Sequence, residues 1–503
     1  MAHILVHHKQ YVLGPRAVRV RPDWTTFELA DGLFLSHCPD LRVLRLRSSD
    51  DTEFCLLGLA VPADIPKTSI SDTFHLRKSS EVEDWTGCWT GRWLLVSPTR
   101  CWQDASGCLG IYYRRAGSEL WMSSSPALLG DHLPGMPASA RLPWRVVHNK
   151  GIDWIPAPFT TRDGVFKVLP QRTFSPRDGA MRPVRYARPA LNGRTDVELL
   201  AMTLERIMTN WARICFREQF IGLTAGLDTR TVLAAAVGAR INALTFTTDY
   251  PVKFKRDVIL PPRVAARAGV PHTLRQPLPV SASEMDARVA AMSEHMDGAT
   301  SHKELRCYSQ CDDDLMNDRE RTFAKGNCFE VGRCFYWGKF SNVAQIEPPT
   351  DPEQILAAFM FQSSWRPEPA ELWRQALQSW IASLSDPVPL DMDWRDRFYL
   401  EQRLGSWNAT VQQGYDIFDS TFFYPGNCLR IFDLLLRHDQ ARRAEGFAQR
   451  EAIRLLAPEL LKIPINPEPI SVRLRQAARK FLGPRVVHIL KSLAPRLVQR
   501  HAP

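Results

Sequence analysis

Six consecutive residues near the middle of the chain have the composition of a phosphate-binding turn. They read TAGLDT and follow the short apolar run Phe220 to Leu223. Proteins bind phosphate where backbone N–H groups point into a concavity at the positive end of a helix dipole. Small side chains let phosphate oxygens approach the backbone, hydroxyls add donors, and a carboxylate can hold a Mg²⁺ ion that bridges phosphates. We therefore predict a phosphate site at Thr224, Ala225, Gly226, Leu227, Asp228 and Thr229, with Asp228 as a metal ligand.

An ordinary tight connection between a strand and a helix is the alternative interpretation of this turn. The flanking segments predict alternating strands and helices. TRTVLAAAV after the turn reads as a helix that Gly238 ends, and INALTFTTD, residues 241–249, reads as a strand. A further helix over 257–268 ends at Gly269. This alternation predicts right-handed crossovers and a parallel sheet that binds ligands at the carboxyl ends of its strands.

The turn and its neighbours resemble the asparagine-synthase superfamily, whose synthetase domain begins with a pyrophosphatase loop reading SGGLDS after a strand. TAGLDT differs from that motif by Ser to Thr at both ends and by one Gly to Ala. The resemblance implies that the strand LTFTTD cradles adenine, which places Thr247 at the nucleotide site. Asp257 and the AxxxG helix end from Ala265 to Gly269 match the family's next element. The cofactors implied are ATP and Mg²⁺.

A second motif of the family reads GEGADELFGGY, and GNCFEVGRCFY, from Gly326 to Tyr336, aligns with it without a gap. Gly326 falls on the first Gly of the ATP site, and Glu330 falls on the Asp that makes the second metal contact. The family's acid/base position becomes Asn327, and its second acidic residue becomes Val331. An amide cannot shuttle a proton at neutral pH, so these departures put the usual acid/base step in doubt.

Family enzymes also use a late lysine to stabilise the charged intermediate that forms when an amine attacks the acyl adenylate. Lys462, in PELLKIPIN, is the positional candidate. The resemblance therefore implies Lys462 and Glu330 as catalytic residues, and Asp228 and Glu330 as metal ligands. A surface lysine with a buried stem is the alternative for Lys462.

The N-terminal part resembles the family's glutaminase-type domain, an Ntn-hydrolase-like β-sandwich with helices. GRWLLV, WQDASG, IYYR and LWMSSSPALL occur in the order of that domain's strands. In active members a nucleophilic cysteine follows the initiator Met, whereas here Met1 is followed by Ala2 and His3. We therefore expect no glutamine hydrolysis and a structural or substrate-binding role for this domain.

Changes in the sequence pattern along the chain predict three parts. Residues 1–188 form an inactive glutamine-amidotransferase-like α+β domain. Residues 189–470 form an α/β PP-loop synthetase domain, like the adenine nucleotide α-hydrolases, with added helices. It opens with an amphipathic helix from Leu199 that Asp196 can cap. Residues 471–503 form a basic amphipathic helix, for which a solvated face packed on the domain is the alternative to a membrane or acidic-peptide contact.

Composition excludes a largely disordered, collagen-like or coiled-coil chain. Of 503 residues, 45% are hydrophobic and 23% are charged, as in folded globular proteins. The net charge of +10 favours anionic partners without identifying one. We expect no transmembrane segment, because no apolar run reaches about 18 residues. We also expect a cytoplasmic location, because the first ten residues lack the apolar core of a secretory signal.

The resemblance implies an ATP-dependent, AMP-forming carbon–nitrogen ligase that adenylates a small-molecule or peptide carboxylate for attack by an amine. Superfamily members without the thiol include lasso-peptide macrolactam synthetases, so peptide cyclisation in natural product biosynthesis is one expectation, with partner proteins from a biosynthetic cluster. The alternatives are an ammonia-dependent asparagine synthase-like enzyme and a catalytically impaired nucleotide-binding pseudoenzyme or scaffold. Nucleic acid is not expected as a partner, because no compact basic and aromatic patch appears in the sequence.

Overall fold

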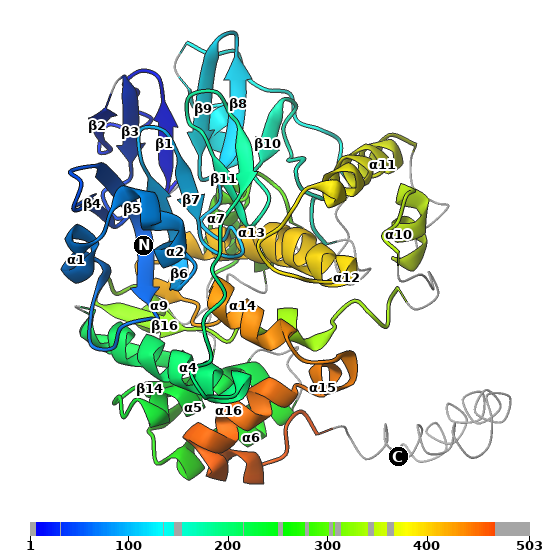
Figure 1. The fold of residues 1–503 in the computed structure, drawn as a ribbon. Helices are drawn as coiled ribbons and strands as arrows, with labels where there is room; N and C mark the ends of the chain where they lie inside the picture. Colours follow the sequence, from blue (N-terminus) through cyan, green and yellow to red (C-terminus); the bar gives the residue numbers. More distant parts are fainter. Residues whose placement is uncertain are drawn as a thin grey trace, which may run out of the picture.

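The described residues form a mixed α/β structure with three β-sheets. In the view of Figure 1, two antiparallel sheets lie above a parallel sheet. The predicted C-terminal helix 471–503 and residues 1–6 lie outside the described residues. The computed structural model describes residues 7–30, 32–133, 135–144, 153–214, 216–249, 255–276, 281–300, 305–306, 313–340, 347–359 and 367–467.

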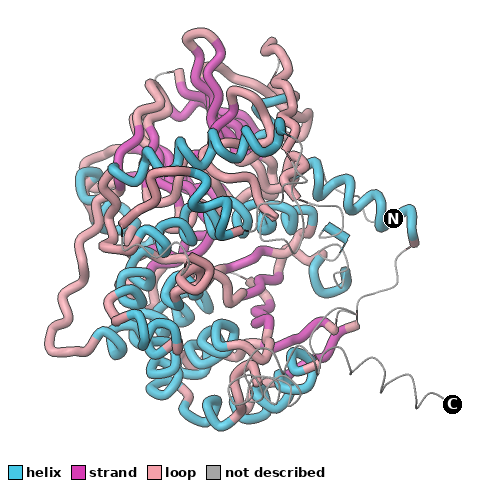
Figure 2. The backbone as a smooth tube through the Cα atoms, turned by 90° about the vertical axis from the view of Figure 1, so that its right-hand side faces the viewer, coloured by secondary structure: helices cyan, strands magenta, loops and turns pink. Residues whose placement is uncertain are grey.

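The first two sheets each have six described strands. One has the order β10-β8-β9-β1-β3-β2, with β1 Tyr11–Gly14, β2 Thr25–Ala30, β3 Leu33–His37, β8 Tyr112–Ala116, β9 Glu119–Ser123 and β10 Val165–Lys167. The other has the order β12-β11-β7-β6-β5-β4, with β4 Val43–Arg47, β5 Glu53–Pro62, β6 Trp89–Val96, β7 Cys101–Gln103, β11 Arg172–Phe174 and β12 Met181–Pro183. Figure 2 shows these strands in the upper part of the molecule.

These sheets pack face to face, because alternate side chains of each strand point to the same side. Leu13 and Leu35 from one sheet meet Leu57, Leu94 and Phe174 from the other in a shared buried core. Short helices cover the outer faces: α1 Ile70–Thr73 and α2 Val82–Thr86 on the second sheet, and α3 Pro126–Gly130 on the first. The prediction that the N-terminal region is rich in strands is therefore confirmed.

The third sheet is parallel and has the order β15-β14-β13-β16-β17. Phe220 of the central strand β13 lies opposite Phe323 of β16, and Ile221 lies opposite Thr245 of β14. Because β14 and β16 lie on opposite sides of β13, the strand order reverses there, which in such sheets opens a crevice at the carboxyl ends of the strands. The strands are β13 Glu218–Gly222, β14 Leu244–Thr248, β15 His272–Arg275, β16 Arg321–Ala324 and β17 Thr421–Phe423.

Helices cover both faces of the parallel sheet. On one face, Ile221 and Phe423 pack in one core with residues of α4, α5 and α16. On the other, Phe220 and Phe323 pack with residues of α7. Figure 1 shows α16 beside α4 and α5, although more than 200 residues separate them in sequence. These helices are α4 Asp196–Arg213, α5 Leu227–Gly238, α6 Arg256–Ala268, α7 Ala282–His295 and α16 Phe447–Leu456.

The predicted helices and strands around the turn are observed, with one correction at a helix cap. The N-cap of α4 is Thr195, whose hydroxyl accepts from the Glu198 N–H, so Asp196 is the first helical residue instead of the cap. Thr195 and Glu198 form a reciprocal capping box, which satisfies two backbone donors where Asp196 would satisfy one. Helix α6 ends as predicted at Gly269, whose φ of +69° is the left-handed cap conformation.

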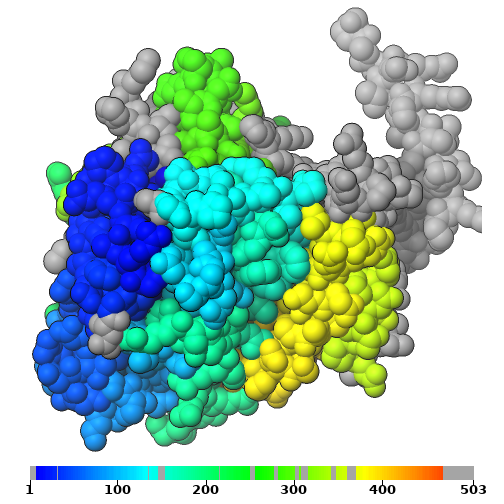
Figure 3. All heavy atoms as spheres, turned by 90° about the horizontal axis from the view of Figure 1, so that it is seen from above, coloured from blue at the N-terminus to red at the C-terminus, as the bar shows by residue number. Residues whose placement is uncertain are grey.

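The remaining helices lie between the parallel strands or after them. Seen from above (Figure 3), the yellow segment that includes α11 lies beside the cyan strands of the sandwich. Within the described residues, no helix combines the length and apolar character needed to cross a membrane. The remaining helices are α9 Asp313–Met316, α10 Pro352–Ala358, α11 Pro367–Ala382, α12 Trp394–Phe398, the π-helix Tyr399–Asn408, α13 Ala409–Gly414, α14 Leu429–Leu436 and α15 Gln440–Ala444.

Candidate functional site

The TAGLDT turn joins the carboxyl end of β13 to the N-terminus of α5, with Gly226 as the helix N-cap. The Thr224 N–H donates to Oγ1 of Thr229 at 3.1 Å, and the Gly226 N–H donates to Oγ1 of Thr224 at 3.1 Å. The Ala225 N–H donates to Oδ1 of Asp257 at 3.0 Å. Burial alternates along the turn: Ala225 and Leu227 are buried, whereas Thr224, Gly226, Asp228 and Thr229 are partly exposed. One face of the turn is therefore accessible.

A buried arginine supports the opposite face of the turn. The Arg230 guanidinium donates to the carbonyls of Ala225 at 3.4 Å, Leu460 at 3.0 Å and Pro464 at 3.2 Å. The Asn466 N–H donates to the same Ala225 carbonyl at 3.0 Å. The segment from Leu460 to Asn466 thus packs against the turn, although it lies more than 200 residues away in sequence.

Lys462 lies in this supporting segment, at the end of the 3₁₀ turn Pro458–Lys462. Its side chain is exposed. Among the contacts of the described residues, none joins its Nζ to Asp228 or Glu330. The structure therefore brings the backbone near Lys462 to the turn and leaves its ammonium group in solvent.

Asp228 and Glu330, the two predicted metal ligands, lie close enough for each carboxyl group to shift the pKa of the other. Asp228 comes from the first turn of α5, and Glu330 comes from the 3₁₀ helix Phe329–Arg333 that follows β16. Arg333 lies between them: its Nη2 is 2.6 Å from Oδ2 of Asp228 and 3.7 Å from Oε1 of Glu330. Gln449 of α16 donates to Oδ1 of Asp228 at 2.9 Å.

Burial is the main reason why the carboxyl groups of Asp228 and Glu330 both have raised pKa values. It raises the pKa of Asp228, against the lowering effect of Arg333 and of hydrogen bonds from Gln449 and Arg333. Burial and the nearby Asp228 charge raise the pKa of Glu330 to about 7. Arg333 therefore lowers the two pKa values by less than burial raises them.

The donor set fits a magnesium ion, because Mg²⁺ binds oxygen ligands and two carboxylates face the same Arg333 nitrogen, at 2.6 and 3.7 Å from its Nη2. Asp228 and Glu330 would hold the ion, provided that Arg333 moves from Asp228. A bound Mg²⁺ would neutralise phosphate oxygens at the N-terminus of α5.

Arg333 and Gln449 were not predicted as site residues. Arg333 lies three residues after Glu330 in the second motif, so the i,i+3 spacing on a helical turn is a signal that could have indicated it. No local pattern marks Gln449, which tertiary packing of α16 brings to Asp228.

Thr247, Asn327 and Val331, three further positions from the sequence analysis, make contacts within the fold. Thr247 is buried on β14, and its hydroxyl donates to the Leu223 carbonyl at 2.7 Å. Asn327 donates through Nδ2 to Oδ1 of Asn408 at 2.9 Å, and Val331 is buried in the core. An amide cannot act as an acid or base at neutral pH, and the partner of Asn327 is another amide. Neither side chain therefore replaces the acid/base residue that the family has at position 327.

Gly326 lies so close to the TAGLDT turn that no side chain fits. A Cβ at this position would be 2.7 Å from the Thr229 nitrogen and 2.9 Å from the Asp228 carbonyl carbon. We expect Gly326→Ala to displace the loop after β16 from α5, with a loss of about 1–3 kcal/mol in the free energy of unfolding. Urea unfolding measures this loss. Gly338→Ala is the matched control, because no atom of the described residues, its chain neighbours apart, lies within 4 Å of an added Cβ. Equal losses for the two variants would contradict the contact.

The raised pKa of Glu330 predicts a pH-dependent contribution to stability. The folded state holds this proton up to about pH 7, whereas an ordinary Glu loses it near pH 4.5. The stabilising contribution is therefore complete below about pH 4.5 and is lost as the pH rises through 7. Glu330→Gln mimics the protonated form, so its stability relative to wild type should be greater at pH 8 than at pH 5, by on the order of 2 kcal/mol.

Urea unfolding of both proteins at the two pH values measures this difference. Glu205→Gln, a change at an exposed position of α4, is the control that should show no such dependence. If the difference in unfolding free energy between Glu330→Gln and the wild type is the same at pH 5 and pH 8, the raised pKa of Glu330 is contradicted.

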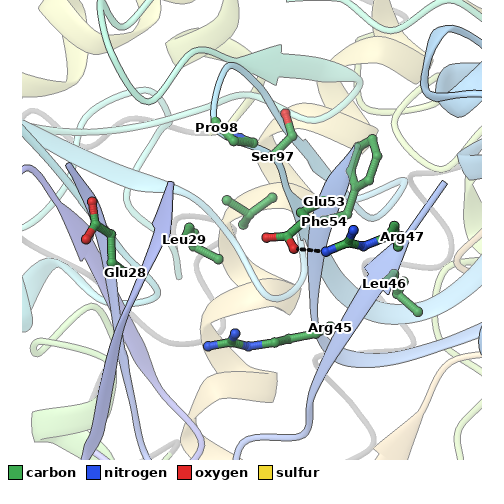
Figure 4. Close-up of a pocket in the computed structure, with 10 residues that line it drawn as sticks. Glu28, Leu29, Arg45, Leu46, Arg47, Glu53, Phe54, Ser97 and Pro98 are labelled. Atoms are coloured by element: carbon green, nitrogen blue, oxygen red, sulfur yellow. Dashed lines mark hydrogen bonds and ion pairs between the residues drawn. The ribbon is translucent and has the colours of Figure 1, made fainter. Parts of the chain in front are cut away.

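A separate cavity of ≈ 260 Å³ lies in the sandwich, between residues of β2, β4, β5 and the end of β6 (Figure 4). Leu29, Leu46 and Phe54 give it an apolar wall, and Arg47 forms an ion pair with Glu53 at its rim. All of its lining residues belong to the sandwich, so this cavity is separate from the TAGLDT turn.

No family model and no curated protein sequence matches the chain. Among solved structures, it is similar to glutamine-dependent NAD⁺ synthetase from Acinetobacter baumannii in complex with ADP, with 15% identity, a TM-score of 0.18 and coverage of 30% of this chain and 27% of that one. It is also similar to glutamine phosphoribosylpyrophosphate amidotransferase from B. subtilis complexed with ADP and GMP, with 10% identity, a TM-score of 0.21 and coverage of 67% and 73%. The chain thus spans about a quarter of the length of the first. Likenesses at this level do not show an activity for this chain.

Proposed function

We propose that the protein is an ATP-dependent synthetase of the asparagine-synthase type, which adenylates a substrate carboxylate and forms an amide bond. One observation carries the proposal: the TAGLDT turn and the loop after β16 meet where the strand order reverses, and there Asp228 and Glu330 converge. Such a crevice is where open parallel sheets bind ligands.

The residues of the turn would bind the triphosphate. The first N–H groups of α5, from Leu227 to Thr229, have no partner within the helix, so they and the helix dipole favour phosphate at this end. The Gly226 N–H already donates to Oγ1 of Thr224. Arg230 and Asp257 hold the turn in place from behind. In this proposal the substrate carboxylate attacks the α-phosphorus and pyrophosphate leaves. An amine then attacks the acyl carbon, and AMP leaves.

The proposed source of nitrogen is an amine of the substrate or free ammonia. Intramolecular attack by a peptide amine would give a macrolactam. Lys462 is exposed, so a role for it in charge stabilisation requires the substrate to reach the surface beside the turn.

Pyrophosphate release tests the proposal. The full-length protein is supplied with ATP and Mg²⁺, and either with aspartate and ammonium or with a peptide that has a free N-terminal amine and an Asp or Glu side chain. We expect substrate-dependent pyrophosphate and AMP in one arm, and the productive arm identifies the nitrogen donor. Failure of the wild-type protein to bind ATP in calorimetry would overturn the proposal.

A nucleotide-binding scaffold is the second candidate, and the Arg333–Asp228 ion pair favours it. The guanidinium occupies one carboxylate that a metal would need, at 2.6 Å, and Asn327 cannot act as an acid or base. ATP binding without pyrophosphate release in either arm would support the scaffold over the enzyme.

A further inference from the structure

Two histidines and a glutamate converge at a place remote in sequence from the phosphate turn. His7 precedes β1, His132 follows α3 in the sandwich, and Glu294 lies in the last turn of α7, which packs on the parallel sheet. Imidazole nitrogens and a carboxylate oxygen are the ligands found in many zinc sites. The three side chains therefore have the right chemistry to bind a metal ion.

The three facing atoms form a nearly regular triangle. Nε2 of His7 is 3.2 Å from Nε2 of His132, and Nε2 of His132 is 3.2 Å from Oε1 of Glu294. The third side, from Nε2 of His7 to the same Oε1, is 3.7 Å. The imidazole rings of His7 and His132 are inclined at 71°, so they meet by their edges and do not stack.

A tetrahedral zinc ion explains these spacings. Zinc bonds to His nitrogen and carboxylate oxygen are about 2.0–2.1 Å long, so two ligand atoms of a tetrahedron lie about 3.3–3.4 Å apart. All three sides of the observed triangle are within a few tenths of an ångström of that value. An ion placed just out of the plane of the triangle would reach all three atoms.

In the tautomer that suits a metal-binding His7, hydrogen bonds leave the three facing atoms one proton short. With the proton of His7 on Nδ1, where it can donate to Oε1 of Gln10 at 3.3 Å, Nε2 of His7 presents a lone pair. Nε2 of His132 then has one proton for two acceptors, Glu294 and His7. Burial lowers the pKa of His7, which keeps its imidazole neutral, as a metal ligand must be.

We propose that His7, His132 and Glu294 bind a divalent transition-metal ion of the zinc type. Three protein ligands leave the fourth tetrahedral position for water, as in zinc sites with an open coordination position. That position faces an open cavity of ≈ 800 Å³, whose lining includes the three ligands together with Val20, Arg21 and Ala291.

The ion would link parts of the fold that are far apart in sequence. His7 and His132 belong to the segments around the first antiparallel sheet, whereas Glu294 belongs to a helix of the parallel sheet. Gln10 would orient His7 through Nδ1, which is the usual position of an outer hydrogen-bond partner of a metal-binding histidine. Bound metal would therefore stabilise the contact between the sandwich and α7.

Zinc titration of the full-length protein without a histidine tag tests the proposal. The protein is treated with a chelator, which is then removed, and ZnCl₂ is added in a calorimeter, while elemental analysis counts the retained metal. We expect one equivalent of zinc per chain at this site and a higher Tm in its presence. His132→Gln should lose that equivalent and the increase in Tm.

Matched variants separate the site from adventitious binding. His75→Gln changes an exposed histidine outside the cluster and should retain the full equivalent. Because His132 and Glu294 are each about one-third exposed, at 35% and 34%, substitutions there should leave the fold intact. Should His132→Gln fail to fold, Glu294→Gln gives the same test and should weaken zinc binding at least tenfold. A wild-type protein that retains no zinc, or a folded cluster variant that binds it as the wild type does, would overturn the proposal.

Discussion

Asp228→Asn is expected to lower ATP-dependent pyrophosphate release by about 100-fold or more, with little loss of stability. The carboxylate lies in the first turn of α5 and interacts with Glu330 at the predicted triphosphate position. Asparagine keeps the shape and an oxygen that can accept from Gln449, but it removes the negative charge that a magnesium ion needs. Burial raises the pKa of Asp228, which disfavours its ionised form in the fold, and Arg333, which loses its ion pair in the variant, is partly exposed, so the folding cost of a neutral amide is small.

The measurement compares pyrophosphate release at saturating ATP with urea unfolding of the same samples. Asp84→Asn makes the same chemical change at an exposed position in the first turn of α2 and should leave release unchanged. If Asp228→Asn releases pyrophosphate as fast as the Asp84 variant, the TAGLDT turn is not the triphosphate site.

Local patterns in the sequence predicted the scaffold of the site well. The turn, the helix after it and the strands on both sides depend on nearest neighbours, such as the small residues at 225–226 and the β-branched and aromatic residues within Leu244–Thr248. The second motif lies beside the first because β16 pairs in parallel with β13. Gly326 and Asp228, which follow these two strands, are therefore in contact at the same end of the sheet. Parallel pairing of this kind follows from alternation of strands and helices.

Contacts between distant segments were beyond sequence reasoning. Gln449 reaches Asp228 only because α16 packs on α5, and Arg230 supports the turn through carbonyls near Leu460. The alignment that placed Glu330 at a metal-ligand position did not show that Arg333 would form an ion pair with Asp228, the other predicted ligand. The zinc-type cluster combines residues 7, 132 and 294, whose sequence spacing matches no metal motif.

The junction between the sandwich and the parallel-sheet part contains a buried ion pair that no pattern indicated. Arg92 of β6 donates to both carboxylate oxygens of Asp416, at 2.6 and 2.7 Å. Their side chains are 10% and 2% exposed. Nearby, the Lys9 ammonium donates to the carbonyls of Phe418, Asp419 and Ser420 at 2.7–2.8 Å. Cationic groups of the sandwich thus bind one segment, residues 416–420, that leads into β17.

Arg92→Met is expected to lower the free energy of unfolding by about 3–5 kcal/mol, because it leaves the Asp416 carboxylate buried without its partner. Methionine fills most of the space of the arginine stem, so the loss comes mainly from the unpaired charge. Urea unfolding followed by tryptophan fluorescence measures it. Arg47→Met is the control, because Arg47 is 56% exposed in its ion pairs with Asp51 and Glu53 and should lose less than about 1 kcal/mol.

The double variant Arg92→Met with Asp416→Leu separates a charge effect from a packing effect. Replacing both members of a buried ion pair by apolar residues of similar volume is often neutral or stabilising, so we expect the double variant to recover most of the stability that Arg92→Met loses. A double variant that is less stable than Arg92→Met would show that the two side chains stabilise the junction by packing. Recovery would instead mean that the ion pair mainly specifies how the two parts of the chain fit together.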